Sequence, residues 1–130
     1  MRTADEMLKH YRKIGGKGGN DKELLKFFEE INRKLKPDEN VITAFYAMSD
    51  VIGDNRVYAL TNTRILWKGK KSNDSMDTED IISASFSITK QYGSEIGIII
   101  LNSYAKDVTI GQGREEAAKT YQMLKNYLEI

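Results

Sequence analysis

The residues of this chain that could carry out chemistry are one histidine and one cluster of carboxylates. A histidine can act as a general base, but His10 is the sole histidine and lies opposite the apolar stripe of its predicted helix, where we expect it to be solvated. The carboxylates between positions 74 and 80 could supply oxygen ligands, yet they lack the spacing and the central glycine of a calcium loop. We therefore expect no catalytic residues, no metal and no other cofactor, and we predict that the chain is not an enzyme. The carboxylates of this cluster are Asp74, Asp77, Glu79 and Asp80.

A basic group follows Trp67 on a predicted hairpin and consists of Lys68, Lys70 and Lys71. Clustered lysines can bind an anion or a phospholipid headgroup. Charged residues at strand ends also protect sheet edges from aggregation, which is the simpler explanation. We keep peripheral membrane or anionic-ligand binding through this hairpin as the alternative function.

The overall composition excludes several other classes of protein. With 20 basic and 19 acidic residues, the chain has a net charge of +1 and no general attraction to nucleic acid, so we predict no nucleic-acid partner. The absence of cysteine excludes disulfides, thiolate zinc sites and cysteine nucleophiles. The charged N-terminus lacks the apolar stretch of a signal peptide, and no later run reaches membrane-spanning length. We expect a cytoplasmic protein.

Residues 1–36 are predicted to form a helical extension of two amphipathic helices. The first helix covers about 3–14, where Thr3 and Glu6 form a capping box and apolar residues recur at helical spacing. Four glycines within 15–19 predict a flexible hinge. The second helix covers about 21–36, with Asn20 or Asp21 as its cap and the single proline, Pro37, after it.

The chain changes to short β-rich runs from position 41 onward. Turn residues separate them, and a final amphipathic helix is predicted over 114–128. Successive short strands favour an antiparallel sheet, so the fold class is α+β. The predicted strands are 41–49, 56–61, 64–68, 81–89, 95–101 and 107–110.

One local sequence resembles the bacterial pleckstrin-homology-like (PH-like) domain family. Residues 57–67, VYALTNTRILW, are similar to its strand-turn-strand pattern hhhLTNxRhhh, where h is apolar, and residues 37–42, PDENVI, resemble the segment that leads into its first strand. The resemblance implies a PH-like antiparallel β-barrel or sandwich over residues 37–130, capped by the C-terminal helix. It gives a structural role to Leu60, Thr61, Asn62, Arg64 and Trp67.

The ligand of many eukaryotic PH domains is not implied by this resemblance. Those domains bind inositol phosphates through basic residues in and around the first hairpin. Here the corresponding loop, 49–55, contains Asp50 and Asp54 and neither lysine nor arginine. A fold signal of this kind does not by itself define a function.

Two predicted strands are apolar on both faces. In a solvated barrel one face of each strand should be polar, but the runs 96–101 and 41–48 carry apolar residues at nearly every position. We therefore expect the outside of the sheet to be covered, either by the N-terminal helices or by a second chain. The leading hypothesis is a non-enzymatic module for protein–protein interaction through the outer face of the β-barrel and the N-terminal helices, with self-association into a homo-oligomer favoured. The contact residues that we predict are Ile99, Leu101, Ile42, Tyr46 and Met48.

Overall fold

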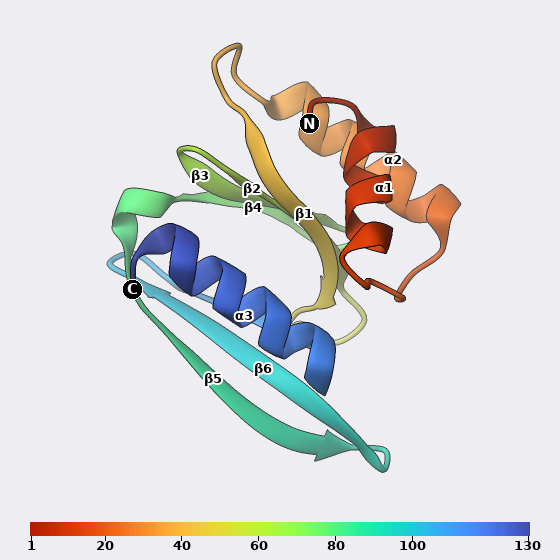
Figure 1. Cartoon of the computed structure of the whole chain (residues 1–130), viewed down its shortest axis with the longest axis vertical. Coiled ribbons are helices and arrows are strands. Elements are labelled where there is room, and N and C mark those ends of the chain that lie inside the picture. The colour runs from red at the N-terminus through yellow and green to blue at the C-terminus, as the bar shows by residue number, and fades with distance from the viewer.

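The computed structural model describes all 130 residues and contains three helices, a short 3-10 helix and seven strands (Figure 1). None of the helices is long and apolar enough to cross a membrane. The elements in chain order are α1 (Ala4–Lys13), α2 (Asp21–Lys34), β1 (Val41–Met48), β2 (Asn55–Thr61), β3 (Arg64–Gly69), β4 (Asn73–Asp77), η1 (Thr78–Asp80), β5 (Ile81–Gln91), β6 (Ser94–Ser103), β7 (Asp107–Gly113) and α3 (Arg114–Leu128).

The seven strands form one antiparallel sheet in the order β4-β3-β2-β1-β7-β6-β5. The sheet curls into a half-barrel, and α3 lies against the inner side of β5, β6 and β7 (Figure 1). The predicted α+β fold, with a C-terminal helix in a PH-like arrangement, is confirmed. The sequence prediction missed β4, an edge strand in which only Met76 is buried, because its polar residues do not alternate with apolar ones.

The two N-terminal helices pack on the β1–β3 part of the sheet and share its core. Thr3 caps α1 by accepting a hydrogen bond from the Glu6 backbone, and Asn20 caps α2 by accepting from the backbone of its first turn. The apolar stripes of both helices face the sheet, which is why their large side chains are buried. The fully buried members are Met7, Tyr11, Leu24, Phe28 and Ile31.

Hydrogen bonds hold the glycine segment between α1 and α2 in place, whereas the sequence predicted a flexible hinge. Arg12 donates hydrogen bonds to the carbonyls of Gly16, Gly18 and Gly19. A Cβ atom on Gly16 would lie 2.1 Å from the Tyr11 ring, so no side chain fits there. Glycine is needed at this position because the Tyr11 ring lies so close to the backbone.

The strands β1 and β7 are paired at fewer residues than any other neighbours in the sheet, and we call this junction the seam. Met48 and Gly111 are the one residue pair that joins these strands in register. Beside this pair, the Gln112 side-chain amide donates to the Tyr46 carbonyl at 3.0 Å in place of a backbone group. The seam therefore separates a block of β1–β4 with α1 and α2 from a block of β5–β7 with α3.

Candidate functional site

The strand β6 has one inward and one outward apolar row, and our prediction selected the wrong row. Ile99 and Leu101 are fully buried in the core, so neither can belong to an exposed contact surface. They pair with Ile110 and Val108 of β7, which also lie in the core. Since side chains alternate along a strand, the outward residues are their neighbours in sequence.

The outward row of β6 forms an apolar stripe of the partly buried residues Ile96, Ile98 and Ile100. No helix packs over it, because α3 contacts the inner side of β5–β7 and the N-terminal helices pack on the other half of the sheet. The stripe pairs with exposed hydroxyl residues of β5 on the same face. We call this surface the outer wall. It consists of Ile96, Ile98 and Ile100 with Ser85, Ser87 and Thr89.

The three predicted contact residues of β1 are half-buried and lie in different surroundings. Met48 borders the outer wall: both Met48 and Ile98 come within 3.5 Å of the point where Gly111 would carry a Cβ. The Tyr46 ring lies against Gly18 of the α1–α2 segment, and Ile42 lies at a β-bulge. The N-terminal segment thus covers part of β1 and leaves the outer wall open.

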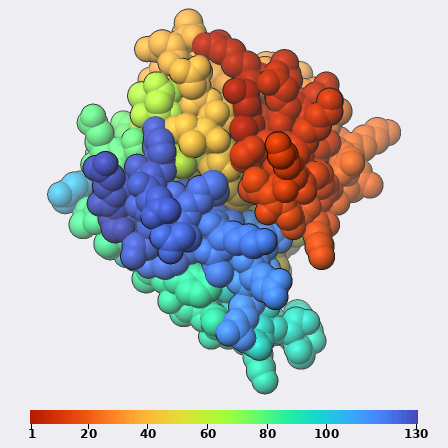
Figure 2. Space-filling view, viewed as in Figure 1, coloured from red at the N-terminus to blue at the C-terminus, as the bar shows by residue number.

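The strand β5 forms one end of the sheet and has a free backbone edge. It is 11 residues long, and its first nine residues, 81–89, carry no charge. Ile82 and Ile88 are 51% and 45% exposed. In Figures 1 and 2 the β5–β6 hairpin extends beyond the rest of the molecule. A long, uncharged, uncovered edge is a ready place for another strand to pair.

The three lysines of the alternative hypothesis do not converge on an open site. Lys68 pairs with Glu30 at 3.2 Å, and Lys70 approaches Glu23 at 3.6 Å, because the acidic side of α2 lies over β3. Lys71 donates to the Ile52 carbonyl at 2.9 Å. Their charges are engaged within the molecule, which argues against a shared anion site.

The LTNTR motif holds a buried carboxylate. The Arg64 guanidinium donates to both carboxylate oxygens of Glu39, at 2.9 and 2.7 Å, and the Thr61 hydroxyl donates at 2.8 Å. The Arg64 hydrogen bonds are the main reason that the pKa of Glu39 falls from 4.5 to about 2. The Asn62 side chain accepts from the Asn40 backbone at 2.9 Å.

Leu60 and Trp67, the remaining members of the motif, are buried in the core. The whole motif therefore acts in the structure as a clamp on the segment that leads into β1.

Asp54, in the loop after β1, is buried and forms an ion pair with Arg56 at 3.0 Å. Burial alone would raise the pKa of Asp54. Hydrogen bonds from Ser72, the Lys71 backbone and Arg56 outweigh it, so this pKa lies below its ordinary value. This carboxylate stabilises the loop and is not free for a ligand.

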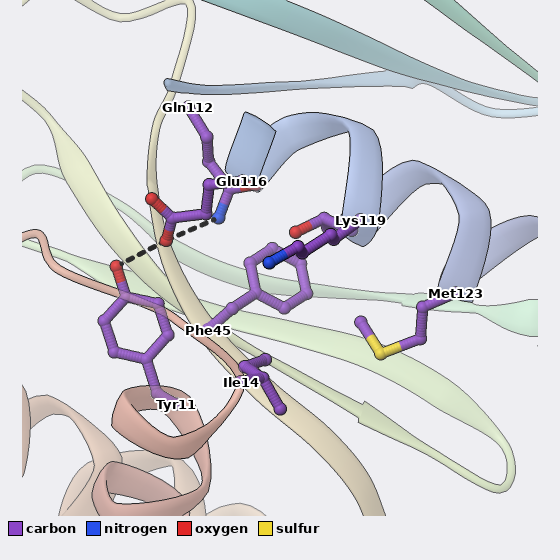
Figure 3. A pocket seen from close by; sticks show the side chains of 8 residues that line it. Tyr11, Ile14, Phe45, Gln112, Glu116, Lys119 and Met123 are labelled. Atoms are coloured by element: carbon purple, nitrogen blue, oxygen red, sulfur yellow. Dashed lines mark hydrogen bonds between the residues drawn. The ribbon is translucent and has the colours of Figure 1, made fainter. Parts of the chain in front are cut away.

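A mostly apolar cavity of about 210 Å³ lies between α1, β1 and α3 (Figure 3). At one side the Tyr11 hydroxyl donates to Glu116 at 2.9 Å, and burial followed by this bond raises the Tyr11 pKa. No nucleophile and base are paired there. The lining residues are Tyr11, Ile14, Phe45, Gln112, Glu116, Lys119, Thr120 and Met123.

His10 is half-buried, which differs from the predicted solvated position. Its Nε2 lies 2.9 Å from the Thr43 hydroxyl. Burial and the nearby Lys13 lower its pKa. The side chain links α1 to β1 and has no carboxylate partner, so the geometry gives it a packing role.

Comparison with known proteins shows the fold alone. No protein-family model matches this chain, and no curated protein matches it. Among solved structures, the crystal structure of the C-terminal domain of an unknown protein from Leishmania infantum is similar, with a TM-score of 0.61 and 14% sequence identity. The match covers 78% of this chain and 98% of that chain.

Proposed function

We propose that this protein is a non-enzymatic interaction module that binds a protein partner, with a second copy of itself favoured, through the outer wall and the β5 edge. We also propose that residues 37–130 belong to the bacterial PH-like domains, since the LTNTR segment forms the tight hairpin that this family's pattern requires. In this proposal the N-terminal helices support the sheet and are not part of the contact surface.

The observation that carries the proposal is an apolar row that nothing in the chain covers. Ile96, Ile98 and Ile100 lie side by side in space on a sheet face, and the hydroxyl residues of β5 continue the same surface without charge. A contiguous, partly exposed apolar row beside an unpaired strand edge is typical of interaction sites. Anionic-ligand binding has weaker support, because Lys68 and Lys70 are paired with α2.

The test measures mass in solution by light scattering across a dilution series. We expect the wild-type protein to approach the mass of a dimer or larger species as its concentration rises. Ile98→Asp places a charge in the middle of the outer wall and should weaken association at least about tenfold.

The matched control is Ile52→Asp, since Ile52 is 92% exposed in the β1–β2 loop, away from the wall. It should associate as the wild type does. A wild-type monomer at all concentrations would refute self-association. An Ile98→Asp variant that remains folded by circular dichroism and associates normally would remove the outer wall from the contact.

A further inference from the structure

We propose that the cavity between α1, β1 and α3 is a binding site for a small uncharged aromatic molecule, and that the N-terminal helix α1 completes this site. The site is separate from the outer wall, which lies on the outside of β5 and β6. The volume of the cavity is about 210 Å³. An engineered apolar cavity of about 150 Å³ is large enough to bind benzene, so a single aromatic ring fits here.

The walls of the cavity come from both blocks of the molecule. Tyr11 and Ile14 belong to α1 and its C-cap and Phe45 to β1, whereas Thr120 and Met123 belong to α3 (Figure 3). The two aromatic rings and the Met123 thioether are surfaces that favour aromatic partners. A water molecule finds few polar partners in such a space, so an apolar ligand displaces it readily.

The cavity is open to a ligand on one side. It shares Ile14, Glu116 and Lys119 with a larger polar groove, which lies between the glycine segment, the β5–β6 turn and the start of α3. Ile14 is 37% exposed, and Lys119 is exposed. These side chains therefore mark the entrance.

The charges at the entrance favour an uncharged ligand. The Glu116 carboxylate accepts from the Tyr11 hydroxyl at 2.9 Å and from the Gln112 amide at 3.5 Å, and Lys119 supplies one positive charge beside it. A carboxylate ligand would meet Glu116 and an ammonium ligand would meet Lys119, so either would lie near a like charge. A charged group would also lose its hydration in the mostly apolar space.

The N-terminal extension is part of this site. Without α1, the cavity would lose the Tyr11 ring and Ile14, and only the walls from β1, β7 and α3 would remain. A ligand that contacts both α1 and α3 binds the docked arrangement of α1 and stabilises it. The extension thereby gains a role in ligand binding besides its support of the sheet.

The test is NMR of the methionine methyl groups in the full chain, with benzyl alcohol as the uncharged probe. Met123 lines the cavity, Met48 borders the outer wall, and Met76 is buried under β4. The Met123 signal should shift and saturate with a Kd of about 5 mM or less. The signals of Met48 and Met76 should stay unchanged.

Benzoate and benzylamine are matched charged probes, since each has the same ring and carries one charge at neutral pH. We expect each of them to bind at least about fivefold more weakly than benzyl alcohol.

Thr120→Phe should fill the cavity, because Thr120 is buried and lines it, and should weaken binding of benzyl alcohol at least about tenfold. Ala118→Phe is the matched control, since Ala118 is exposed on the same helix, and it should bind as the wild type does. Circular dichroism checks folding. Ile14→Trp, at the exposed entrance, is a second variant that should weaken binding and that leaves the core unchanged.

A Met123 signal that does not respond to benzyl alcohol in the folded wild type would refute the site. Tighter binding of benzoate or benzylamine would overturn the uncharged class of ligand. Normal affinity in folded Thr120→Phe and Ile14→Trp, or a response of Met48 alone, would place the probe elsewhere and refute the cavity site. None of these outcomes decides the self-association, which light scattering tests separately.

Discussion

Replacing Glu39 with glutamine should remove a stabilisation that depends on pH. The Glu39 side chain is 1% exposed and bonds Arg64, Thr61 and the Lys36 backbone. The folded state lowers its pKa from 4.5 to about 2, so the ionised form is bound more strongly than the protonated form. This difference corresponds to about 3 kcal/mol of the free energy of unfolding.

The sign of the effect follows from the lowered pKa. Above pH 4.5 the carboxylate is ionised in both states, and the full contribution is present. As the pH falls from 4.5 to about 2, the unfolded state binds a proton first, and the contribution is lost. Glutamine has nearly the same shape but no charge, so Glu39→Gln lacks this pH-dependent contribution at every pH.

Urea denaturation of both proteins between pH 7 and pH 2 measures the contribution as a difference. The free energy of unfolding of Glu39→Gln should be about 3 kcal/mol lower at pH 7, and the gap should shrink below about 1 kcal/mol at pH 2. Both proteins share every other carboxylate, so the difference between their free energies of unfolding removes the pH-dependent contributions of those groups. Glu29→Gln is the control, because Glu29 is exposed on α2. A gap that stays constant across this range would refute the reasoning.

Two further substitutions test the packing. Gly97→Ala should lower the free energy of unfolding by about 2 kcal/mol, because its Cβ would lie 2.4 Å from that of Ala117 on α3. Gly113→Ala meets nothing within 4 Å and loses only the preference for glycine over alanine at the N-cap of α3, so it should lower this free energy by about 1 kcal/mol or less in the same urea measurement, and equal losses would contradict this account. Arg12→Met should speed tryptic cleavage after Lys17 about fivefold by releasing the glycine segment, whereas an unchanged rate would mean that the Arg12 hydrogen bonds do not hold it.

The elements with local signals could be predicted from the sequence. Thr3 and Asn20 mark helix starts through their own side chains, and the LTNTR segment marks a hairpin. The strand β4 carries no such signal, since an edge strand outside the core needs no apolar alternation. It forms because β3 offers a free edge next to it in the chain.

The contact surface could be predicted only in part. Ile98 and Ile99 are the same residue type, so composition cannot say which one faces the core, and the docking of α3 decides it. The lysines posed a similar problem. Whether Lys68 is free depends on Glu30, which is distant in sequence and arrives only when α2 packs over β3.

The seam between β1 and β7 has a consequence for how the molecule unfolds. The ladder that joins the two blocks consists of Met48 with Gly111 and the side-chain bond of Gln112. Separating the blocks would break few backbone hydrogen bonds, but it would expose the single hydrophobic core that residues of both blocks form. The shared core, and not the sheet ladder, therefore holds the two blocks together, and the chain is expected to unfold as one cooperative unit.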